Sequence, residues 1–155
     1  MSKEIVRRLM LPVVVLSVGS ALGAGDRGTP AEAKALLAKA VAHYKAVGRK
    51  QALDDFTRKK APFVDRDLYV GCIGPDHTIT ANGGFNSMVG RSADVLKDAD
   101  GKALGKALWD AASAKGGGSV QYRWLNPVSA QIEPKISFAQ RVGEDVCVVG
   151  AYDPH

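Results

Sequence analysis

The chain has 155 residues, which suits a single domain, and its 46% hydrophobic and 24% charged content is ordinary for a globular protein. The formal net charge of +5 is mild, and no run of lysine and arginine with interleaved aromatic residues occurs, which argues against nucleic-acid binding. The sequence has no CxxC, HExxH or GxSxG motif and no glycine loop placed before a helix to cradle phosphate. It therefore predicts no catalytic residues, no metal site and no cofactor.

Residues 1–24 have the pattern of a secretory signal peptide. Three basic residues within the first eight positions precede an apolar stretch from Leu9 to Leu22, and small residues suited to signal peptidase follow. This apolar stretch is shorter than the roughly 20 residues that a membrane-spanning helix needs, which favours cleavage over an uncleaved anchor. The sequence thus predicts an exported protein, periplasmic or secreted, with residues 25–155 as its mature domain.

The mature chain opens with a strong helix signal. The run 29–32, Thr-Pro-Ala-Glu, predicts a helix start because the threonine can cap, the proline suits the first turn and the glutamate completes a capping box. Apolar residues then recur with helical spacing over 33–47, and Gly48 is placed to end the helix. A shorter helix is expected around 52–56, before Pro62.

The remaining elements predict a sheet interrupted by one helix. A crossover with a helix over 103–114 separates the second strand from the third, and Asp98 and Asp100 are interpreted as caps of that helix. The loop after the third strand is expected to end at Pro134. Five strands are expected, over residues 68–73, 78–81, 119–125, 135–142 and 146–152. The layout predicts an α+β domain in which a long N-terminal helix packs on one mainly antiparallel sheet.

Cys72 and Cys147 are the only two cysteines. An oxidising compartment permits a disulfide between them, provided that their strands are neighbours. The alternative is that both are small buried core residues. The sequence leaves both interpretations open.

Short runs in a fixed order resemble motifs of the single Cache domain family, second subtype. The similar runs are 63–70 (FVDRDLYV), 88–90 (MVG), 96–102 (LKDADGK), 122–127 (YRWLNP), 133–137 (EPKIS) and 150–152 (GAY). The resemblance implies a PAS-like Cache fold and a free-standing secreted member. Family members are mostly extracytoplasmic input domains of chemoreceptors and sensor kinases, and several bind short-chain carboxylates between the sheet and its crossover. This chain departs from the family at Gly74, where an aspartate is frequent, and at Asn82, where a histidine is frequent.

Four side chains are expected to form one anion-binding patch. Alternate residues of a strand share a face, so Tyr122 lies beside Trp124 and Lys135 beside Ser137, on two strands that a hairpin would join. An ammonium, hydroxyls and aromatic walls suit a small organic anion. In this hypothesis, which the resemblance strengthens, Lys135 pairs with the carboxylate, Ser137 and Tyr122 donate hydrogen bonds and Trp124 encloses the alkyl part.

Tyr69 on the first strand and Arg66 just before it are further candidates, Arg66 as a second positive group. The run Asp65-Arg66-Asp67 equally suits a local salt-bridged turn. A rival hypothesis makes the aromatic residues core packing and leaves Lys135 exposed. The protein would then be a periplasmic structural or adaptor protein with a closed pocket. A membrane sensor or another protein is the expected partner in either case, and the long helix is a candidate homodimer contact.

Overall fold

The computed structural model describes residues 27–152, so the predicted signal peptide lies outside the described residues. This range contains three α-helices, two short 3-10 helices and six strands. In chain order they are α1 (Pro30–Val47), α2 (Arg49–Thr57), β1 (Val64–Asp65), β2 (Leu68–Ile73), β3 (Ile79–Asn82), η1 (Asn86–Met88), η2 (Ala93–Val95), α3 (Leu104–Ala111), β4 (Gly118–Leu125), β5 (Ile132–Val142) and β6 (Asp145–Tyr152). Among the residues described, no helix is both long and apolar enough to cross a membrane.

The strands form one antiparallel sheet in the order β1-β2-β6-β5-β4, with β3 also paired to β2. The predicted α+β layout is confirmed, because the five expected strands are β2 to β6 and α3 lies in the crossover between β3 and β4. β1 adds two residues that the sequence did not predict. The last strand, β6, lies at the centre of the sheet, between β2 and β5.

The predicted end of the loop at Pro134 was wrong. β5 begins at Ile132, and Pro134 lies inside the strand, opposite Arg123 of β4. Proline removes a backbone N–H and is usually confined to sheet edges. It is tolerated here because the pairing of β5 with β6 begins only at Lys135.

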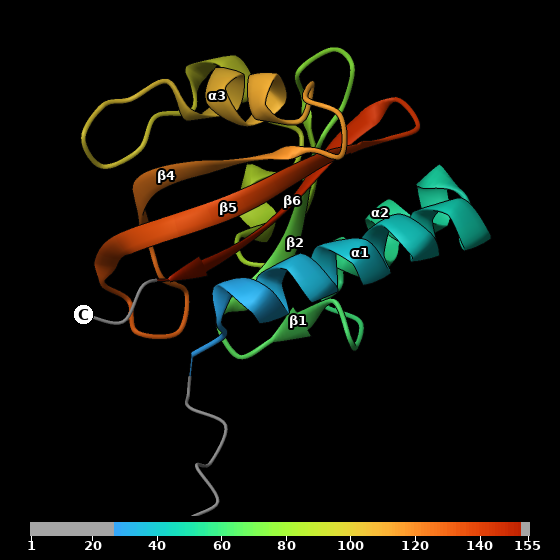
Figure 1. Cartoon of the computed structure of the whole chain (residues 1–155), viewed down its shortest axis with the longest axis horizontal. Coiled ribbons are helices and arrows are strands. Elements are labelled where there is room, and N and C mark those ends of the chain that lie inside the picture. Colours follow the sequence, from blue (N-terminus) through green and yellow to red (C-terminus); the bar gives the residue numbers. More distant parts are fainter. Residues whose placement is uncertain (1–26, 153–155) are drawn as a thin grey trace, which may run out of the picture.

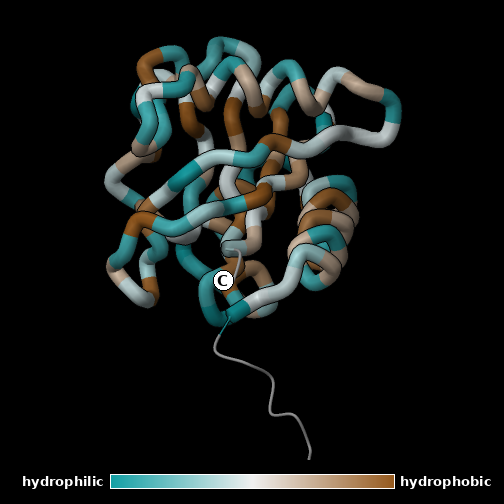
Figure 2. The backbone as a smooth tube through the Cα atoms, turned by 60° about the vertical axis from the view of Figure 1, so that its left-hand side comes forward, coloured by the Kyte–Doolittle hydropathy of each residue, from teal (hydrophilic) through white to brown (hydrophobic). Residues whose placement is uncertain are grey.

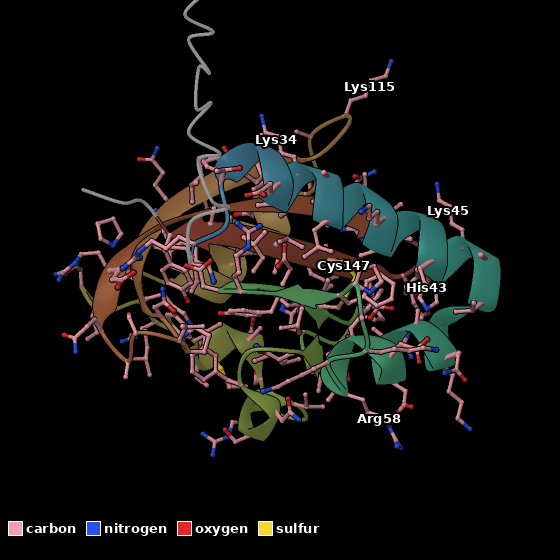
Figure 3. All side chains as sticks on the ribbon, turned by 90° about the horizontal axis from the view of Figure 1, so that it is seen from below. Lys34, His43, Lys45, Arg58, Lys115 and Cys147 are labelled. Carbon is pink, nitrogen blue, oxygen red and sulfur yellow. A yellow bond between two sulfur atoms is a disulfide. The ribbon has the colours of Figure 1, made fainter. Side chains whose placement is uncertain are left out.

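The start of α1 forms as the sequence predicts. The Thr29 hydroxyl accepts a hydrogen bond from the Glu32 backbone at 3.2 Å, and the Glu32 carboxylate accepts one from the Thr29 backbone at 2.7 Å. The buried positions of α1 recur with helical spacing, so one stripe faces the sheet. Figure 3 shows Lys34 and Lys45 extending from the same helix away from the sheet.

Helical segments cover both faces of the sheet (Figure 1). α1 and α2 pack on one face, where Phe56, Val70 and Val149 are fully buried. α3 and the 3-10 helices pack on the other, around Ile73, Leu104 and further apolar side chains of the crossover. Apolar residues accordingly gather in the central strands and polar residues in the outer loops (Figure 2). The second face holds the cavity described below.

A disulfide joins β2 to β6. Cys72 and Cys147 lie directly opposite each other in the register of these two strands, and their sulfur atoms are bonded. The bond links positions 75 residues apart in the sequence, across the middle of the sheet.

Asp145 at the start of β6 ties four elements together. Its side chain is fully buried and accepts hydrogen bonds from Tyr44 Oη of α1 at 2.6 Å, Arg49 Nε of α2 at 2.7 Å and Thr80 Oγ1 of β3 at 2.9 Å. The Asp145 carboxylate and burial together raise the pKa of Tyr44, burial being the larger cause. The helical layer is therefore fixed to the sheet by polar bonds as well as by apolar packing.

The prediction that Asp98 and Asp100 cap α3 was wrong. Asp98 accepts hydrogen bonds from the backbone N–H groups of Asp100 at 3.0 Å and Lys102 at 2.8 Å, which closes a turn ahead of the helix. The helix itself begins after Ala103 and has no side-chain cap.

Candidate ligand pocket

A cavity of about 50 Å³ lies between the sheet and the crossover that carries α3. One end is polar, and the rest is enclosed by aliphatic and aromatic side chains. The polar lining comes from Tyr69, Asn82, Tyr122, Lys135 and Ser137, and the apolar lining includes Ile73, Ile79, Met88, Leu96, Leu104, Leu108, Trp124 and Val148. The lining therefore contains one cationic side chain and no aspartate or glutamate.

Lys135 supplies the positive charge. The residue is 4% exposed, and its Nζ donates hydrogen bonds to Tyr69 Oη at 2.9 Å and Tyr152 Oη at 3.2 Å. Nζ also lies 4.1 and 4.3 Å from the centroids of these two rings. Within residues 27–152, no carboxylate lies at ion-pair distance from this amine. An ammonium has three N–H donors, so one is left for a ligand.

Burial lowers the pKa of Lys135 to about 7, against the opposing effect of the Asp67 carboxylate. The cause is desolvation, since a charged amine loses favourable hydration inside a protein. An anion that entered the cavity would restore that lost stabilisation. The local electrostatics thus favour an anionic occupant.

Ser137 and Tyr122 add hydroxyl groups beside the amine. Their oxygens are 2.7 Å apart, and Tyr122 lies directly opposite Lys135 in the β4–β5 register. Gly150 makes room for this arrangement: a Cβ at that position would lie 2.2 Å from Ser137 Oγ and 2.3 Å from Lys135 Cε. The two side chains therefore converge above the bare backbone of Gly150.

Asn82, at the end of β3, offers an amide donor to the cavity. Its Oδ1 accepts hydrogen bonds from the backbone N–H groups of Gly84 at 3.0 Å and Phe85 at 2.7 Å. These bonds assign the amide orientation and turn Nδ2 the other way, toward Met88 Sδ at 3.9 Å. A thioether is a weak acceptor, so the Nδ2 donor is available to a ligand.

Aromatic rings enclose the polar end. The rings of Tyr122 and Trp124 meet nearly edge to face at 6.1 Å, and Phe85 contacts both Trp124 at 6.4 Å and Tyr69 at 6.0 Å in the same way. Burial raises the pKa of Tyr69 and Tyr122, so both phenols stay neutral hydrogen-bonding groups. The rings keep bulk water from the amine.

Arg66 does not reach this cavity. It lies in the turn between β1 and β2 with a φ of 56°. Its guanidinium bonds the carboxylates of Asp65 and Glu32 at 2.8 Å each and the Arg27 carbonyl at 2.8 Å. Arg66 therefore belongs to a local salt-bridged turn and is not a second positive group of the pocket.

A buried polar cluster lies beside the pocket, near the start of β5. Glu133, two residues before Lys135 on β5, binds the Arg27 guanidinium, which lowers the pKa of Glu133 to about 2. Asn126 donates to Glu133 at 3.1 Å and to Asp67 at 3.2 Å. Asp67 also accepts the backbone N–H of Gly28 at 2.7 Å. This cluster fixes the start of the described chain to the β4–β5 hairpin.

Five of the six residues predicted to bind a ligand line the same cavity, namely Tyr69, Tyr122, Trp124, Lys135 and Ser137. Their role as ligand contacts stays a prediction. Sequence reasoning missed Asn82 as a donor and Met88 as a wall. It gave no role to Leu104 and Leu108, although their helical spacing indicated an apolar face of α3 turned inward.

Comparisons with known proteins agree on the fold. The family model described as Single Cache domain 2 matches residues 24–152. A methyl-accepting chemotaxis protein from Vibrio parahaemolyticus RIMD 2210633 superposes with a TM-score of 0.67 at 22% identity, covering 79% of this chain and 86% of that chain. No match is found among curated proteins.

Two further solved structures are similar. One is described as the periplasmic sensor domain of a chemotaxis protein, with a TM-score of 0.60, 22% identity and coverage of 80% of this chain and 90% of that chain. The other comes from work described as the structural basis for carboxylic acid recognition by a Cache chemosensory domain. Its TM-score is 0.59 at 20% identity, with 80% and 88% of the two chains covered. At these identities the likeness establishes a shared fold.

Proposed function

The chain belongs to the single Cache domain 2 family, and from this premise we propose that it is an exported, sensor-type domain that reversibly binds a short-chain carboxylate without catalysis. The observation that carries the proposal is the buried amine of Lys135, which faces a cavity and has no carboxylate partner among residues 27–152. Burying a cation is costly unless it is paired, so the site is electrostatically incomplete until an anion enters.

The cavity limits the size and the charge of the ligand. A water molecule needs roughly 10–15 Å³ of such space, so about 50 Å³ accommodates roughly three to five non-hydrogen atoms. Acetate and propionate fit this limit. The lining has no carboxylate that could pair with the ammonium of an amino acid, which disfavours amino acids. It has a single cation, Lys135, which disfavours dicarboxylates.

Each polar group of the lining contacts a defined part of the ligand in this proposal. Lys135 pairs with the carboxylate, Ser137 and Tyr122 donate hydrogen bonds, and Asn82 donates from the end of β3. The alkyl part lies against Trp124 and the crossover side chains. The resemblance to a domain whose description names carboxylic acid recognition supports the same ligand class.

Export is part of the proposal. The apolar stretch of residues 1–24 supports a signal peptide. The disulfide between Cys72 and Cys147 is consistent with an oxidising compartment. We propose that the domain acts in the periplasm or outside the cell and presents its ligand state to a membrane sensor or another protein partner.

Thermal unfolding in the presence of candidate ligands tests the binding. The mature protein is melted with acetate, propionate, butyrate, succinate and glycine at matched ionic strength. Acetate or propionate is expected to raise Tm, because a ligand at 100 times its Kd stabilises the native state by about 2.7 kcal/mol. Lys135→Ala should lose the response, and Lys34→Ala, a change at an exposed position of α1, should keep it.

The small cavity also favours a second candidate, a periplasmic adaptor whose pocket is filled by its own side chains. Most small-molecule pockets enclose about 300–1,000 Å³, well above the volume found here. The same melts decide between the two candidates. Absence of any shift across the panel, with the protein folded, would favour the adaptor over the sensor.

A further inference from the structure

Lys135 combines three features that also suit covalent chemistry at its amine. Its amine is buried, it is held by two phenol oxygens and not by a carboxylate, and it borders a cavity that admits a small molecule. We propose that Lys135 captures the carbonyl carbon of a small α-keto acid, with pyruvate as the probe, as a reversible imine. This inference rests on the proposed function in that it needs the same pocket to accept small acids.

The chemical basis is the state of the amine. Only an unprotonated lysine is nucleophilic, and an exposed lysine with a pKa near 10.4 is unprotonated in fewer than about one molecule in a thousand at pH 7. Burial lowers the pKa of Lys135 to about 7, so that roughly half of the molecules carry the free amine at that pH. A desolvated lysine in a hydrophobic pocket is a known way to activate this nucleophile.

The surrounding groups match the rest of an α-keto acid. The hydroxyls of Ser137 and Tyr122 converge with the lysine stem over Gly150 and can bind the carboxylate next to the carbonyl. Asn82 Nδ2 provides a further donor. Trp124 and the crossover side chains enclose the methyl end. Pyruvate has about six non-hydrogen atoms and its imine keeps about five of them, so loss of water brings the bound acid to the size limit inferred above.

The step balances without a further reactant. The lone pair of Nζ attacks the carbonyl carbon and forms a C–N bond, and the π electrons of the carbonyl move to its oxygen. One amine hydrogen passes to that oxygen, giving a carbinolamine. The hydroxyl then leaves as water together with the second amine hydrogen, and C=N remains. Burial raises the pKa of Tyr69, so its hydroxyl stays neutral. This hydroxyl lies 2.9 Å from Nζ and is placed to relay these protons.

Reductive trapping tests the proposal on the wild-type protein. The mature protein is incubated with pyruvate and cyanoborohydride near pH 7, and the product is examined by intact mass and peptide mapping. We expect one reduced adduct per chain, located on Lys135. Its rate of formation should exceed that at any exposed lysine about a thousandfold, because of the difference in unprotonated fraction. The exposed Lys34, Lys45 and Lys115 serve as internal references (Figure 3).

Two variants control the experiment. Lys135→Arg keeps the charge but cannot form an imine, so the major adduct should disappear, whereas Lys34→Arg, a change at an exposed position, should keep it. Labelling spread over surface lysines at equal rates in wild type would overturn the proposal, and this outcome needs no variant to fold. Acetate stabilisation without trapping would refute the imine and leave the proposed function standing. Failure of both experiments would refute both.

Discussion

Lys135 makes the free energy of unfolding depend on pH. Its pKa in the folded protein, about 7, lies below the roughly 10.4 of an exposed lysine. Between these two values the unfolded chain binds more protons than the folded one. The free energy of unfolding of the ligand-free protein should therefore rise with pH above 7, by up to about 1.4 kcal/mol per pH unit from this residue.

Lys135→Met tests that dependence. The methionine is similar in length and carries no charge, so the variant should lose the Lys135 part of the pH slope and be more stable than wild type below pH 7. Urea unfolding at intervals from pH 6 to 9 measures the difference. Carboxylate binding to wild type should weaken as pH rises through 7, because the ligand needs the protonated amine. An identical pH slope in both proteins would show that the amine is hydrated in solution.

Gly150→Ala should remove ligand binding while sparing the fold. The new methyl group would lie 2.2 Å from Ser137 Oγ and 2.3 Å from Lys135 Cε, so both side chains have to move, and 3.2 Å from the Ile136 carbonyl oxygen. The acetate-induced rise in Tm should be lost while the circular dichroism spectrum is retained.

Gln121→Ala is the control for that change. Gln121 is exposed on β4 and does not line the cavity. This variant should keep the acetate response. An acetate response of wild-type size in Gly150→Ala would contradict the assigned position of the ligand.

Individual site residues differ in how far the sequence predicts them. Tyr122 and Lys135 come together because a simple hairpin joins their strands, and alternation sets the face. Asn82 could not be predicted as a donor, since its amide orientation depends on the backbone of the following loop. Arg66 was ambiguous for a local reason: an acid on each side of it in the sequence already offered partners.

At the scale of elements, Asp145 connects both helices of the α1–α2 layer to the sheet. Asp145→Ala leaves Tyr44 and Thr80 without their acceptor and should reduce the free energy of unfolding by about 3 kcal/mol. Chemical denaturation followed by circular dichroism measures this change.

Asp54→Ala is the matched control. It removes an exposed ion pair with Arg58, which caps the C-terminal end of α2, and should change stability little. Equal effects of the two substitutions would show that the contacts of Asp145 contribute no more than a surface pair.

The elements themselves follow from local patterns, and their exact limits do not. The capping box at Thr29 and the helical period after it predict α1 from neighbouring residues alone. β5 extends three residues further toward its start than expected, because pairing with β4 continues past Pro134 to Ile132. That pairing depends on a partner strand and not on the propensity of proline.

At the scale of the whole molecule, the disulfide joins the first long strand to the last. Replacing Cys72 and Cys147 by alanine should lower the free energy of unfolding by about 2–5 kcal/mol, because the unfolded chain gains the freedom of a long loop. Denaturant titration of the double variant measures the loss, and reduced wild type should match it. Unchanged stability on reduction would contradict a structural role for the bond.

The sequence left this pairing open for a topological reason. Cys72 and Cys147 become neighbours only because β6 inserts at the centre of the sheet beside β2. No local pattern encodes that insertion. The part-buried bond between Glu133 and Arg27, more than 100 positions apart, had no sequence signal either.

The two ends of the described chain are both attached at the start of β5. Arg27 is bonded to Glu133, and Tyr152 is the cross-strand neighbour of Lys135. A mechanical pull on Arg27 and Tyr152 would therefore act directly on the Arg27–Glu133 ion pair and on the Lys135–Tyr152 pair of β5 and β6, while the disulfide at Cys147 holds β6 to β2. The amine proposed to hold the anion belongs to one of these directly loaded pairs.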